Sequence, residues 1–552
     1  MATFTVTNPF DSGSGSFRQA IFDANTQAGT DEIVFDTGGF PSTITLTSGE
    51  LNITDSVNIL GSGADWLTVS GNNNSRIFSI GDGGSQILDV LISGLTVSDS
   101  NGDTGGPLLG GAIYNEDENL TLMDLVVTNN TIKYFGVPGG GIFNSSGKLT
   151  ITNSIISHNS AFTDSRDGVG LTNGEGGGIY NGSGIVNIHN STISHNRAFG
   201  ASGRHSFSSG KGGGIFNRSG ELVVTDSTIS DNTAAGGGGA FYADSPGNGG
   251  GIFNDSGMVK VDNSTISGNR AIGGSGDSFS SGPGEGGGIF NRSGELVVTN
   301  STINSNMAVG GRSITATNGQ AANGFGGGIS GKVTLSNSTI SGNIAAGGLG
   351  YQANGGNGYG GGLWGWGTVT NSTITGNAAQ GGNSYSGDSG IGIGSGIFNT
   401  EMMTITSSII ADNTDATDLA GNSFTSGGHN LIGNGDGTPG FINGVNNDQV
   451  GTTDNPIDPL LGLLQNNGGS TATHALLPGS LAIDAGSNPL MLLTDQRGDG
   501  FNRTVGSQTD VGAFEVQPPL GTSVPEPSSM LGLLGLLILG TTSLLKRKRQ
   551  QH

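Results

Sequence analysis

Cysteine is absent from this chain of 552 residues. The absence excludes disulfide bonds, thiolate metal sites and a cysteine nucleophile. Charged residues make up only 11% of the sequence, which is less than in most acidic disordered proteins. Basic residues are the scarcer charges, with 20 Lys and Arg against 43 Asp and Glu and a net charge of −23. Because phosphate binding needs a basic face, these numbers argue against a nucleic-acid partner.

Proline and aromatic residues are also few, whereas glycine is abundant. The chain contains 15 Pro and 107 Gly, and aromatic residues make up 6% of it. Since the glycines follow no Gly-X-Y period and proline is rare, the sequence is not collagen-like. Glycine must therefore either fill unstructured segments or stand at joints between structured units.

A repeat distinguishes between these two uses. Each copy contains a Gly run, Ile, an aromatic residue and Asn, then a short apolar stretch, then Asn-Ser-Thr-Ile-Ser and Asn. The residue after the Gly run recurs every 34 to 40 residues, at Ile142, Ile179, Ile215, Ile252, Ile289, Ile329, Leu363 and Ile397. Eight copies in register indicate a repeat architecture in which much of the glycine marks joints.

Within one copy the apolar residues alternate with a period of two. Leu222 and Val224 share one face of residues 221–225, and the position between them varies among the copies. We expect three short strands in each copy, with Gly and Asn at corners that need a positive φ. The rest is a Gly-, Ser- and Asn-rich insert, such as residues 199–211. One such coil cannot bury its own apolar face, so the repeats predict an all-β parallel solenoid with inserts along one edge.

Three parts of the chain resemble a known family. They are residues 15–35, the repeats from Gly94 onward, and C-terminal phrases at residues 458–461, 465–469, 473–474, 478–480, 482–486, 494–498 and 510–515. The chain resembles the pectin-lyase-like right-handed parallel β-helix proteins, and more narrowly the bacterial proteins that carry a choice-of-anchor Q domain. The resemblance covers residues 3–516. It implies a single-stranded right-handed parallel β-helix of about 10–12 coils with a short N-terminal capping helix, but no general activity.

These features predict five parts of the chain. Residues 1–109 form the N-terminal cap and the first coils, and residues 110–415 form the regular repeats with Gly-rich edge inserts. Residues 416–516 form the choice-of-anchor Q-like region. A Pro-rich linker, residues 517–527, leads to a C-terminal segment, residues 528–552.

The C-terminal segment has the composition of a membrane span. Residues 528–545 carry no charge, are rich in Leu and Gly, and are just long enough for a transmembrane helix across a hydrocarbon core of about 30 Å. A basic membrane stop follows, and it predicts a cytoplasmic C-terminus. The stop consists of Lys546, Arg547, Lys548 and Arg549.

The motif before this span resembles a sorting signal. It consists of Val524, Pro525, Glu526 and Pro527. The whole segment resembles the PEP-CTERM signal of Gram-negative envelopes, which implies an exosortase as partner and cleavage near the motif. The alternative is an ordinary single-pass anchor. Residues 1–10 have no basic or apolar region typical of a signal peptide. Either such a peptide lies upstream of Met1 or export uses another route, and we favour the former.

The sequence contains no recognisable catalytic constellation. Polysaccharide hydrolases need two or more carboxylates at a defined separation. Asn413-Thr414-Asp415 matches one motif of the polygalacturonase-type enzymes, but their Asp-Asp, Gly-His-Gly and Arg-Ile-Lys motifs do not follow. Asn413 is moreover an ordinary repeat Asn, so we interpret the triplet as structural.

Candidate metal ligands are equally weak. His158, His195 and Asp231 share one position in consecutive coils, and stacking would place neighbours about 4.8 Å apart. Later copies have Gly or Ser there, so the position is typical of an exposed turn. We predict no cofactor, with loose Ca²⁺ binding by loop carboxylates such as Asp436, Asp495 and Asp499 left open.

Three kinds of side-chain row should run along the solenoid. The first consists of stacked amides, at Asn144, Asn181, Asn217, Asn254 and Asn291. The second consists of outward Thr and Ser on either side of the buried Ile of the Ser-Thr-Ile-Ser strand, as at Thr192 and Ser194. The third consists of the aromatic residues after the first Ile, which either form an exposed glycan-binding stripe or are covered by the inserts.

Taken together, the sequence predicts an exported, envelope-associated surface protein without enzymatic activity, acting in adhesion, extracellular matrix or exopolysaccharide association. The alternative is a polysaccharide-active lyase or hydrolase, and a minor alternative is an ice-binding solenoid. The predicted partners are the exosortase, extracellular polysaccharide and, at least transiently, the membrane through residues 528–545. Arg497-Gly498-Asp499 is interpreted as part of the C-terminal phrase and not as an adhesion tripeptide.

Overall fold

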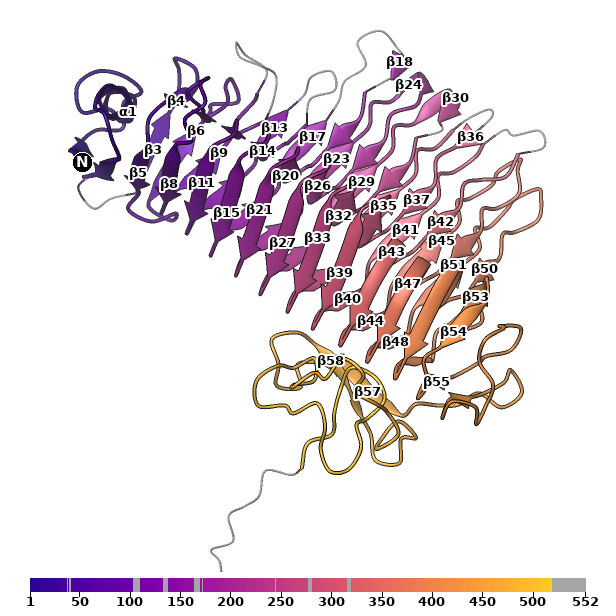
Figure 1. Cartoon of the computed structure of the whole chain (residues 1–552). Coiled ribbons are helices and arrows are strands. Elements are labelled where there is room, and N and C mark those ends of the chain that lie inside the picture. The colour runs from indigo at the N-terminus through magenta and orange to yellow at the C-terminus, as the bar shows by residue number, and fades with distance from the viewer. Residues whose placement is uncertain are drawn as a thin grey trace, which may run out of the picture. The chain divides into compact units, whose positions relative to one another are not determined.

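The computed structural model describes residues 1–518 except residues 37, 39–40, 103–109, 133–137, 163–168, 171, 244, 277–279 and 315–318. The chain divides into two units, Met1–Glu515 and Val516–His552. All helices and strands given below belong to the first unit (Figure 1).

A short helix and two strands close the N-terminal end. Helix α1 (Phe17–Thr26) begins at Ser16, whose side chain accepts a hydrogen bond from the Gln19 N–H, and it buries Phe17 and Ile21 against the solenoid. Strand β1 (Thr3–Val6) pairs in parallel with β2 (Asp31–Phe35). The predicted capping helix is confirmed, whereas β1 was not predicted.

Sheet A contains two strands of each coil, arranged in two rows, and β1 and β2 at its N-terminal end. Its first row, whose strands have the sequence Ile-aromatic-Asn from β10 onward, consists of β4 (Leu51–Ile53), β7 (Phe78–Ile80), β10 (Ile113–Asn115), β14 (Ile142–Asn144), β20 (Ile179–Asn181), β26 (Ile215–Asn217), β32 (Ile252–Asn254) and β38 (Ile289–Asn291). Its second row consists of β5 (Val57–Leu60), β8 (Asp89–Ser93), β11 (Asn119–Met123), β15 (Lys148–Thr152), β21 (Ile185–His189), β27 (Glu221–Thr225), β33 (Met258–Asp262) and β39 (Glu295–Thr299).

The two rows join where the Asn-x-Ser-Gly turn between them is missing. The joined strands are β43 (Ile329–Ser336), β47 (Leu363–Thr370) and β51 (Ile397–Thr406), after which β53 (Leu419–Gly421) and β54 (Phe424–Ser426) end the sheet. The turn is therefore a local feature of the coils before Ile329, and it bends sheet A there.

Sheet B contains one Thr-Ile-Ser-type strand per coil and has 14 strands, all in parallel register with their neighbours. They are β3 (Ser42–Thr45), β6 (Leu67–Ser70), β9 (Thr96–Ser98), β12 (Val126–Thr128), β16 (Ile155–Ser157), β22 (Thr192–Ser194), β28 (Thr228–Ser230), β34 (Thr265–Ser267), β40 (Thr302–Asn304), β44 (Thr339–Ser341), β48 (Thr373–Thr375), β52 (Ile409–Ala411), β55 (Leu431–Ile432) and β56 (Gln449–Val450). The parallel β-helix is thus confirmed, and its length exceeds the predicted 10–12 coils.

The core lies between sheets A and B. The aliphatic residues predicted to point inward are fully buried, including Leu222, Val224 and Ile229. A single coil cannot bury its own apolar surface, and the neighbouring coils cover it. The coils therefore stabilise one another along the solenoid.

The inserts are more regular than the sequence predicts. Directly after the repeat Asn, an eight-stranded sheet C adds β13 (Thr131–Ile132), β17 (Ser160–Phe162), β23 (Arg197–Phe199), β29 (Thr233–Ala235), β35 (Arg270–Ile272), β41 (Met307–Val309), β45 (Ile344–Ala346) and β49 (Ala378–Gln380). Directly before the Gly run, sheet E adds β19 (Gly174–Glu175), β25 (Gly210–Lys211), β31 (Gly247–Asn248), β37 (Gly284–Glu285), β42 (Gly324–Phe325), β46 (Gly358–Tyr359) and β50 (Gly392–Ile393). The three predicted strands of each copy are therefore confirmed, but the prediction that a copy has only three was wrong.

Sheets C and E pack back to back with almost no space between them. The central residue of the sheet C strands is a fully buried alanine, as at Ala198 and Ala234. A Cβ added to the opposing Gly210 would lie 2.3 Å from the carbonyl oxygens of Ala198 and Ala235. The glycines of the inserts therefore allow close backbone contact in addition to forming turns.

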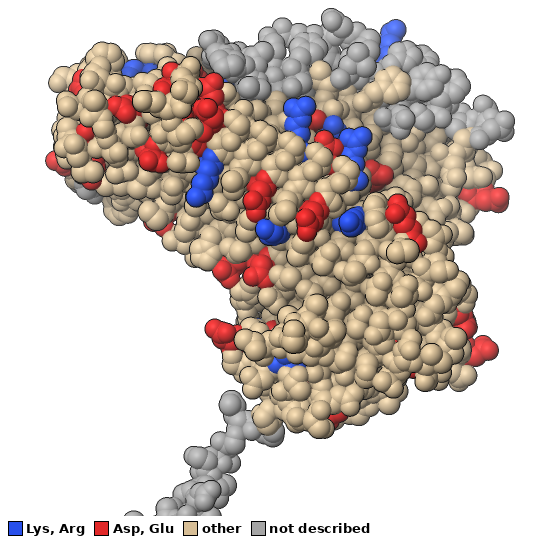
Figure 2. All heavy atoms as spheres, viewed as in Figure 1, with Lys and Arg blue, Asp and Glu red and all other residues tan. Residues whose placement is uncertain are grey.

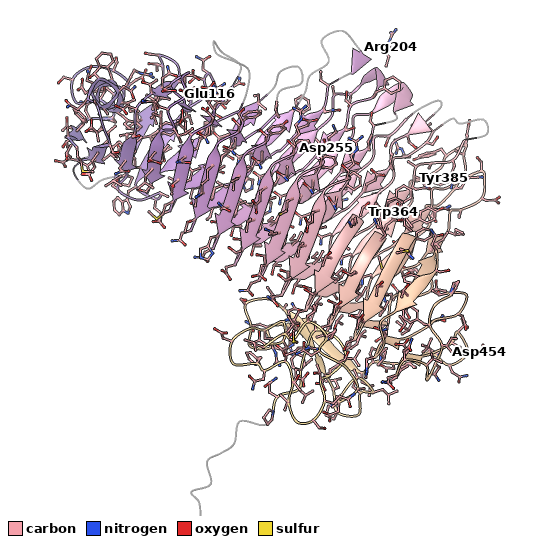
Figure 3. All side chains as sticks on the ribbon, viewed as in Figure 1. Glu116, Arg204, Asp255, Trp364, Tyr385 and Asp454 are labelled. Atoms are coloured by element: carbon pink, nitrogen blue, oxygen red, sulfur yellow. The ribbon has the colours of Figure 1, made fainter. Side chains whose placement is uncertain are left out.

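The outermost parts of the inserts form the projecting edge of the solenoid. A small sheet D there consists of β18 (Val169–Gly170), β24 (Gly203–Ser206), β30 (Gly239–Ala243) and β36 (Ser280–Ser281). Figure 3 shows Arg204 and Tyr385 on segments that project along this edge.

The predicted corners with a positive φ are confirmed. Asn190, His195 and Gly212 have φ values of 45°, 56° and 61°. They lie at three corners in two consecutive coils. Asn, Asp and Gly tolerate this left-handed conformation better than other residues.

The C-terminal region folds back onto the outer face of sheet B. Its two antiparallel strands are β57 (Leu461–Gln465) and β58 (Thr473–Leu476). Gln496 Nε2 donates to Thr302 Oγ1 (2.8 Å), and Thr339 Oγ1 donates to Gln496 Oε1 (2.6 Å). Further along, the Ala513 N–H donates to Thr373 Oγ1 (3.1 Å). Residues 456–515 therefore cover one flank of the solenoid, whereas β53 to β56, which also follow residue 415, extend sheets A and B.

Candidate functional site

A shallow groove of about 720 Å³ crosses the coils at the Asn-x-Ser-Gly turns of sheet A. It begins at Ser183 and ends at Lys332, where the turn disappears and β43 runs straight through. Five stacked coils contribute to it, so it extends for about 20 Å along the solenoid axis. The shape fits an extended chain better than a compact small molecule.

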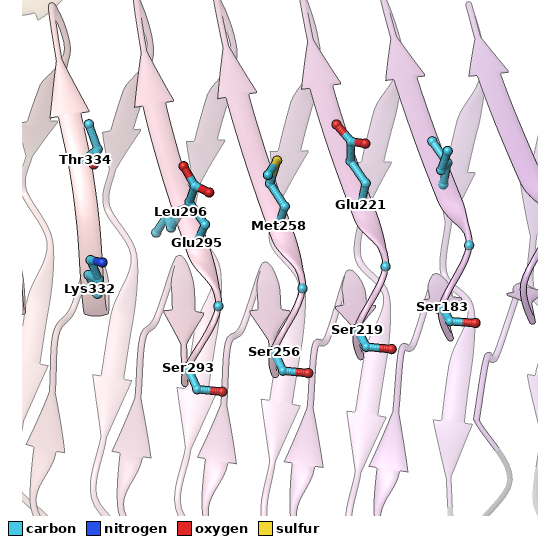
Figure 4. A pocket seen from close by; sticks show the side chains of 15 residues that line it. Ser183, Ser219, Glu221, Ser256, Met258, Ser293, Glu295, Leu296, Lys332 and Thr334 are labelled. Carbon is cyan, nitrogen blue, oxygen red and sulfur yellow. The ribbon is translucent and has the colours of Figure 1, made fainter.

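Serine hydroxyls line one side of the groove at the spacing of the coils. Figure 4 shows Ser183, Ser219, Ser256 and Ser293 in a row with their hydroxyls pointing the same way. The last three each donate to a backbone carbonyl of the preceding coil: Ser219 to Gly182 (3.2 Å), Ser256 to Arg218 (2.9 Å) and Ser293 to Asp255 (2.6 Å). Because these hydrogens are used within the protein, the oxygens present free lone pairs to a ligand's hydroxyl groups.

Charged and apolar side chains line the other side. Glu221, Met258 and Glu295 occupy one register position in consecutive coils of sheet A. Lys260 Nζ lies 3.3 Å from Glu221 Oε1, and both side chains are more than one-third exposed. Such an exposed ion pair contributes little to stability, so these groups remain available to solvent.

The charges of this face are mixed in sign. Figure 2 shows basic and acidic side chains interspersed over the middle coils. Ion pairs account for part of this pattern, as between Arg292 and Asp255 (3.0 Å) and between Lys211 and Glu175 (2.9 Å). A face of this kind is not specialised for a polyanion.

Sequence reasoning missed the groove serines. Their signal was present as the Asn-x-Ser-Gly phrase, for example at residues 217–220 and 254–257. Asn from this phrase was correctly predicted to stack. Asn217 Nδ2 donates to Asn254 Oδ1 (2.8 Å), and the same bond joins Asn254 to Asn291. The serine two positions later escaped notice because a hydroxyl beside a glycine is also typical of any turn.

The predicted aromatic row exists but is covered. Tyr114, Phe143, Tyr180, Phe216, Phe253 and Phe290 form a separate buried cluster, each 9% exposed or less. Consecutive rings stack, for example Tyr180 on Phe216 with centroids 5.0 Å apart. Burial raises the pKa of both Tyr114 and Tyr180. Of the two expectations for this row, the covered arrangement is confirmed.

The aromatic row is interrupted in the coil that contains Ile329. Ser330 replaces the aromatic residue there, and the Phe325 ring stacks on Tyr359 (5.3 Å) and contacts Trp364 (5.1 Å). In this coil, Phe325 of sheet E thus provides the aromatic ring that sheet A lacks at Ser330.

The outward Thr and Ser row is only partly open. Thr192, Thr228 and Thr265 are partly exposed, whereas Thr302, Thr339 and Thr373 are buried beneath the C-terminal region. The expected continuous flat array is therefore wrong for its second half, because these hydroxyls bond to the C-terminal region. A flat array of outward Thr is the type of surface that ice-binding solenoids use, so the ice-binding alternative loses its main feature.

The Asn413-Thr414-Asp415 triplet has the structural role expected of it. Asn377 Nδ2 donates to Asn413 Oδ1 (2.9 Å), and Asn413 Nδ2 donates to Asp418 Oδ1 (2.8 Å). Asn413 is thus the last amide of a buried row that Asp418 ends. Burial raises the pKa of Asp418 to about 6, while hydrogen bonds from Asn413 oppose the shift.

The predicted His pair also stacks. The rings of His158 and His195 lie 4.9 Å apart and nearly parallel, and His158, His195 and Asp231 all have φ near 56°. Within the described part of the chain, no group of three or more His, Asp or Glu side chains is suited to hold a metal ion.

The C-terminal loop residues serve the fold. Asp495 is fully buried, and its Oδ2 lies 2.6 Å from Arg497 Nη2. The Arg497 guanidinium lies between the rings of Phe501 (3.9 Å) and Phe514 (3.7 Å). Asp495 is therefore an ion-pair partner and not a loose Ca²⁺ ligand, and the Arg-Gly-Asp segment begins with a buried residue. Asp436 accepts a hydrogen bond from the Thr453 N–H (2.7 Å), which lowers its pKa.

The predicted sorting segment lies outside the described residues. This applies to Val524, Pro525, Glu526 and Pro527, to residues 528–545, and to Lys546, Arg547, Lys548 and Arg549. Among the residues that are described, no helix has the length and apolar character to cross a membrane.

Comparison with known proteins identifies the C-terminal segment. Residues 523–549 match the family described as the PEP-CTERM protein-sorting motif, and this range includes both predicted motif elements. No curated protein matches the chain.

Solved structures of low similarity were also found. Pectate lyase Pel9A shares 14% identity over 94% of this chain and 97% of its own, with a TM-score of 0.32. The A-module of mannuronan C-5 epimerase AlgE6 from Azotobacter vinelandii shares 13% identity over 81% of this chain and 97% of its own, with a TM-score of 0.26. Geobacillus virus E2 ORF18 shares 11% identity over 73% of this chain and has a TM-score of 0.29. The chain spans 61% of that protein.

Proposed function

We propose that the protein is an exported β-helix that associates with extracellular polysaccharide at the cell envelope and does not cleave it. The match to a protein-sorting motif indicates export and sorting to the envelope. An exosortase that recognises Val524, Pro525, Glu526 and Pro527 is the corresponding partner, and residues 528–545 are the segment that would enter the membrane. The choice-of-anchor Q-like region at residues 416–516 belongs to the same proposal.

The groove at the Asn-x-Ser-Gly turns is the observation that carries the binding function. It is open, crosses five coils and repeats the same hydroxyl at each Ser-Gly turn. A polysaccharide also repeats its hydroxyls along an extended chain, so both partners present periodic hydrogen-bonding groups. Each contact is weak in water, but several in a row bind together.

A groove-filling substitution tests this function. Ser219→Trp and Ser256→Trp place a large side chain on the exposed wall of the groove, and the full chain should then lose binding to exopolysaccharide isolated from the producing cells. Ser146→Trp is the matched control, because Ser146 is exposed and donates to Glu116 O (3.3 Å) in the same turn of an earlier coil outside the groove. Equal co-sedimentation of all three variants and the unaltered protein would exclude the groove as the binding site.

A polysaccharide hydrolase is the second candidate. Glu221 and Glu295 lie two coils apart in one register, which places them roughly 10 Å from each other along one side of the groove. Carboxyl groups of inverting glycosidases are separated by about 6.5–9.5 Å, so the spacing of these two residues lies just above that range. Release of reducing ends from a glycan panel, abolished in Glu295→Gln, would establish the hydrolase and refute the non-enzymatic function.

A further inference from the structure

Two tyrosines form an exposed stack on the insert edge, well away from the buried aromatic row. The rings of Tyr351 and Tyr385 lie 4.9 Å apart with an interplanar angle of 26°. The guanidinium carbon of Arg312 lies 5.3 Å from the centroid of the Tyr351 ring. Exposure is 37% for Tyr351 and 72% for Tyr385, whereas the aromatic residues of sheet A from Tyr114 to Phe290 are at most 9% exposed.

The backbone beneath the stack is regular. Bridges connect Ser313 with Gly350 and Gly350 with Ser384, so the three residues of the stack belong to consecutive coils. The Tyr351 N–H donates to Ser313 O (2.9 Å), and the Tyr385 N–H donates to Gly350 O (3.0 Å). The rings are therefore held on a hydrogen-bonded support, which lowers the entropy lost when a ligand binds them.

The stack ends at Tyr385 because the following coil is short. That coil passes directly from Thr414, which bridges to Ala378, to Thr417, whose carbonyl accepts from the Ser395 N–H (2.8 Å). The preceding coil instead extends outward through Ser384 and Tyr385 before it returns at β50. One face of the Tyr385 ring packs on Tyr351, and the 72% exposure of the residue leaves the opposite face open to solvent. Figure 3 shows this side chain at the outer edge.

We propose that the open face of Tyr385 is a carbohydrate-binding platform that packs against pyranose rings of a neutral β-linked polysaccharide. The inference rests on the proposed function and names the class of its ligand. A pyranose ring with equatorial hydroxyls presents C–H groups on both faces, and their partial positive charge is attracted to the negative face of an aromatic ring. Arg312 holds the other end of the stack by the same electrostatic attraction.

The charge of the chain selects a neutral polymer. With a net charge of −23, the protein repels acidic polysaccharides at long range. Asp388, which is exposed on the same insert as Tyr385, adds a local negative charge. A neutral glucan avoids both costs and can still use the serine oxygens of the groove as hydrogen-bond acceptors.

Binding of the full chain to amorphous cellulose tests the platform. We expect Tyr385→Ala to weaken binding about fivefold or more, since one aromatic stacking contact contributes about 1 kcal/mol. Tyr385→Phe keeps the ring and should bind within about twofold of the unaltered protein. Phe10→Ala is the control, because Phe10 is 68% exposed on the N-terminal cap and lies far along the chain from the stack.

The outcomes separate this inference from the proposed function. Equal binding of Tyr385→Ala and the unaltered protein, or tighter binding of the unaltered protein to polygalacturonate than to cellulose, would overturn the platform. If the unaltered protein still binds exopolysaccharide from the producing cells in either case, the proposed function stands without the platform. If the unaltered protein binds none of the three polymers, both are wrong.

Discussion

A single buried glutamine joins the C-terminal region to the solenoid. Gln496 is fully buried. Its side-chain amide forms hydrogen bonds with Thr302 and Thr339 of sheet B and with Thr471 of its own region (3.0 Å). We expect Gln496→Ala to cost about 2–3 kcal/mol, because it removes the buried amide and leaves the buried Thr339 hydroxyl without its acceptor. Limited proteolysis should then cut residues 456–515 faster than the coils. Gln465→Ala, at an exposed position of β57, is the control, and equal protease resistance of both variants would contradict this role.

Glu285 makes stability depend on pH. Burial between the coils raises the pKa of its carboxyl to about 7, although the Arg292 guanidinium opposes the shift. The stabilising contribution of the protonated form is complete below pH 4.5, the ordinary value, and is lost as the pH rises toward 7. Glu285→Gln should therefore be more stable than the unaltered protein at pH 8, by about 1–3 kcal/mol, and equally stable at pH 4.

Thermal unfolding at the two pH values measures this difference. Glu401→Gln changes an exposed carboxylate in β51 and should leave both melting temperatures unaltered. A Glu285→Gln variant that is less stable at pH 8 would show that the buried carboxylate is favourable when charged.

At the scale of the strand, the buried aromatic row links each coil to the next. The Phe253 ring lies 5.0 Å from that of Phe216 and 5.2 Å from that of Phe290. Phe253→Ala should cost about 3 kcal/mol through the cavity that it leaves. Hydrogen exchange should accelerate in β26, β32 and β38, because each coil of a solenoid depends on its neighbours. The exposed Phe10→Ala is the control, and equal exchange in both variants would refute a stabilising row.

The sequence predicted some strands and not others for a physical reason. In residues 221–225, Leu222 and Val224 alternate with a variable position, and this contrast marks a strand with one buried face. In β23, Ala198 is the buried residue, but it stands between Arg197 and Phe199, so apolar character does not alternate. Glycine pairs such as β25 carry no side-chain pattern at all, and only the stacking of complete coils reveals them.

The same distinction applies to the candidate sites. The groove follows from a local phrase that repeats in register, so it could be predicted once the strands were known. The Tyr351–Tyr385 stack could not, because the inserts differ in sequence and length, and only the paired backbone brings the two rings into consecutive coils.

At the scale of the whole molecule, the C-terminal region determines which flank remains open. Its contacts with sheet B connect residues far apart in the chain, as Ser341 with His474 (2.9 Å). No local pattern predicts such contacts. The region occupies the later coils of sheet B, whereas the groove lies in sheet A and the tyrosine stack on the insert edge. Both candidate binding surfaces therefore remain accessible while the C-terminal region is docked.

The central claim is that the protein binds polysaccharide and leaves it intact, and one measurement tests both parts. The full chain is incubated with exopolysaccharide from the producing cells, and bound protein, new reducing ends and unsaturated uronates are quantified in the same samples. The account predicts saturable binding with neither product above a protein-free control. Release of either product in proportion to the amount of protein would contradict it.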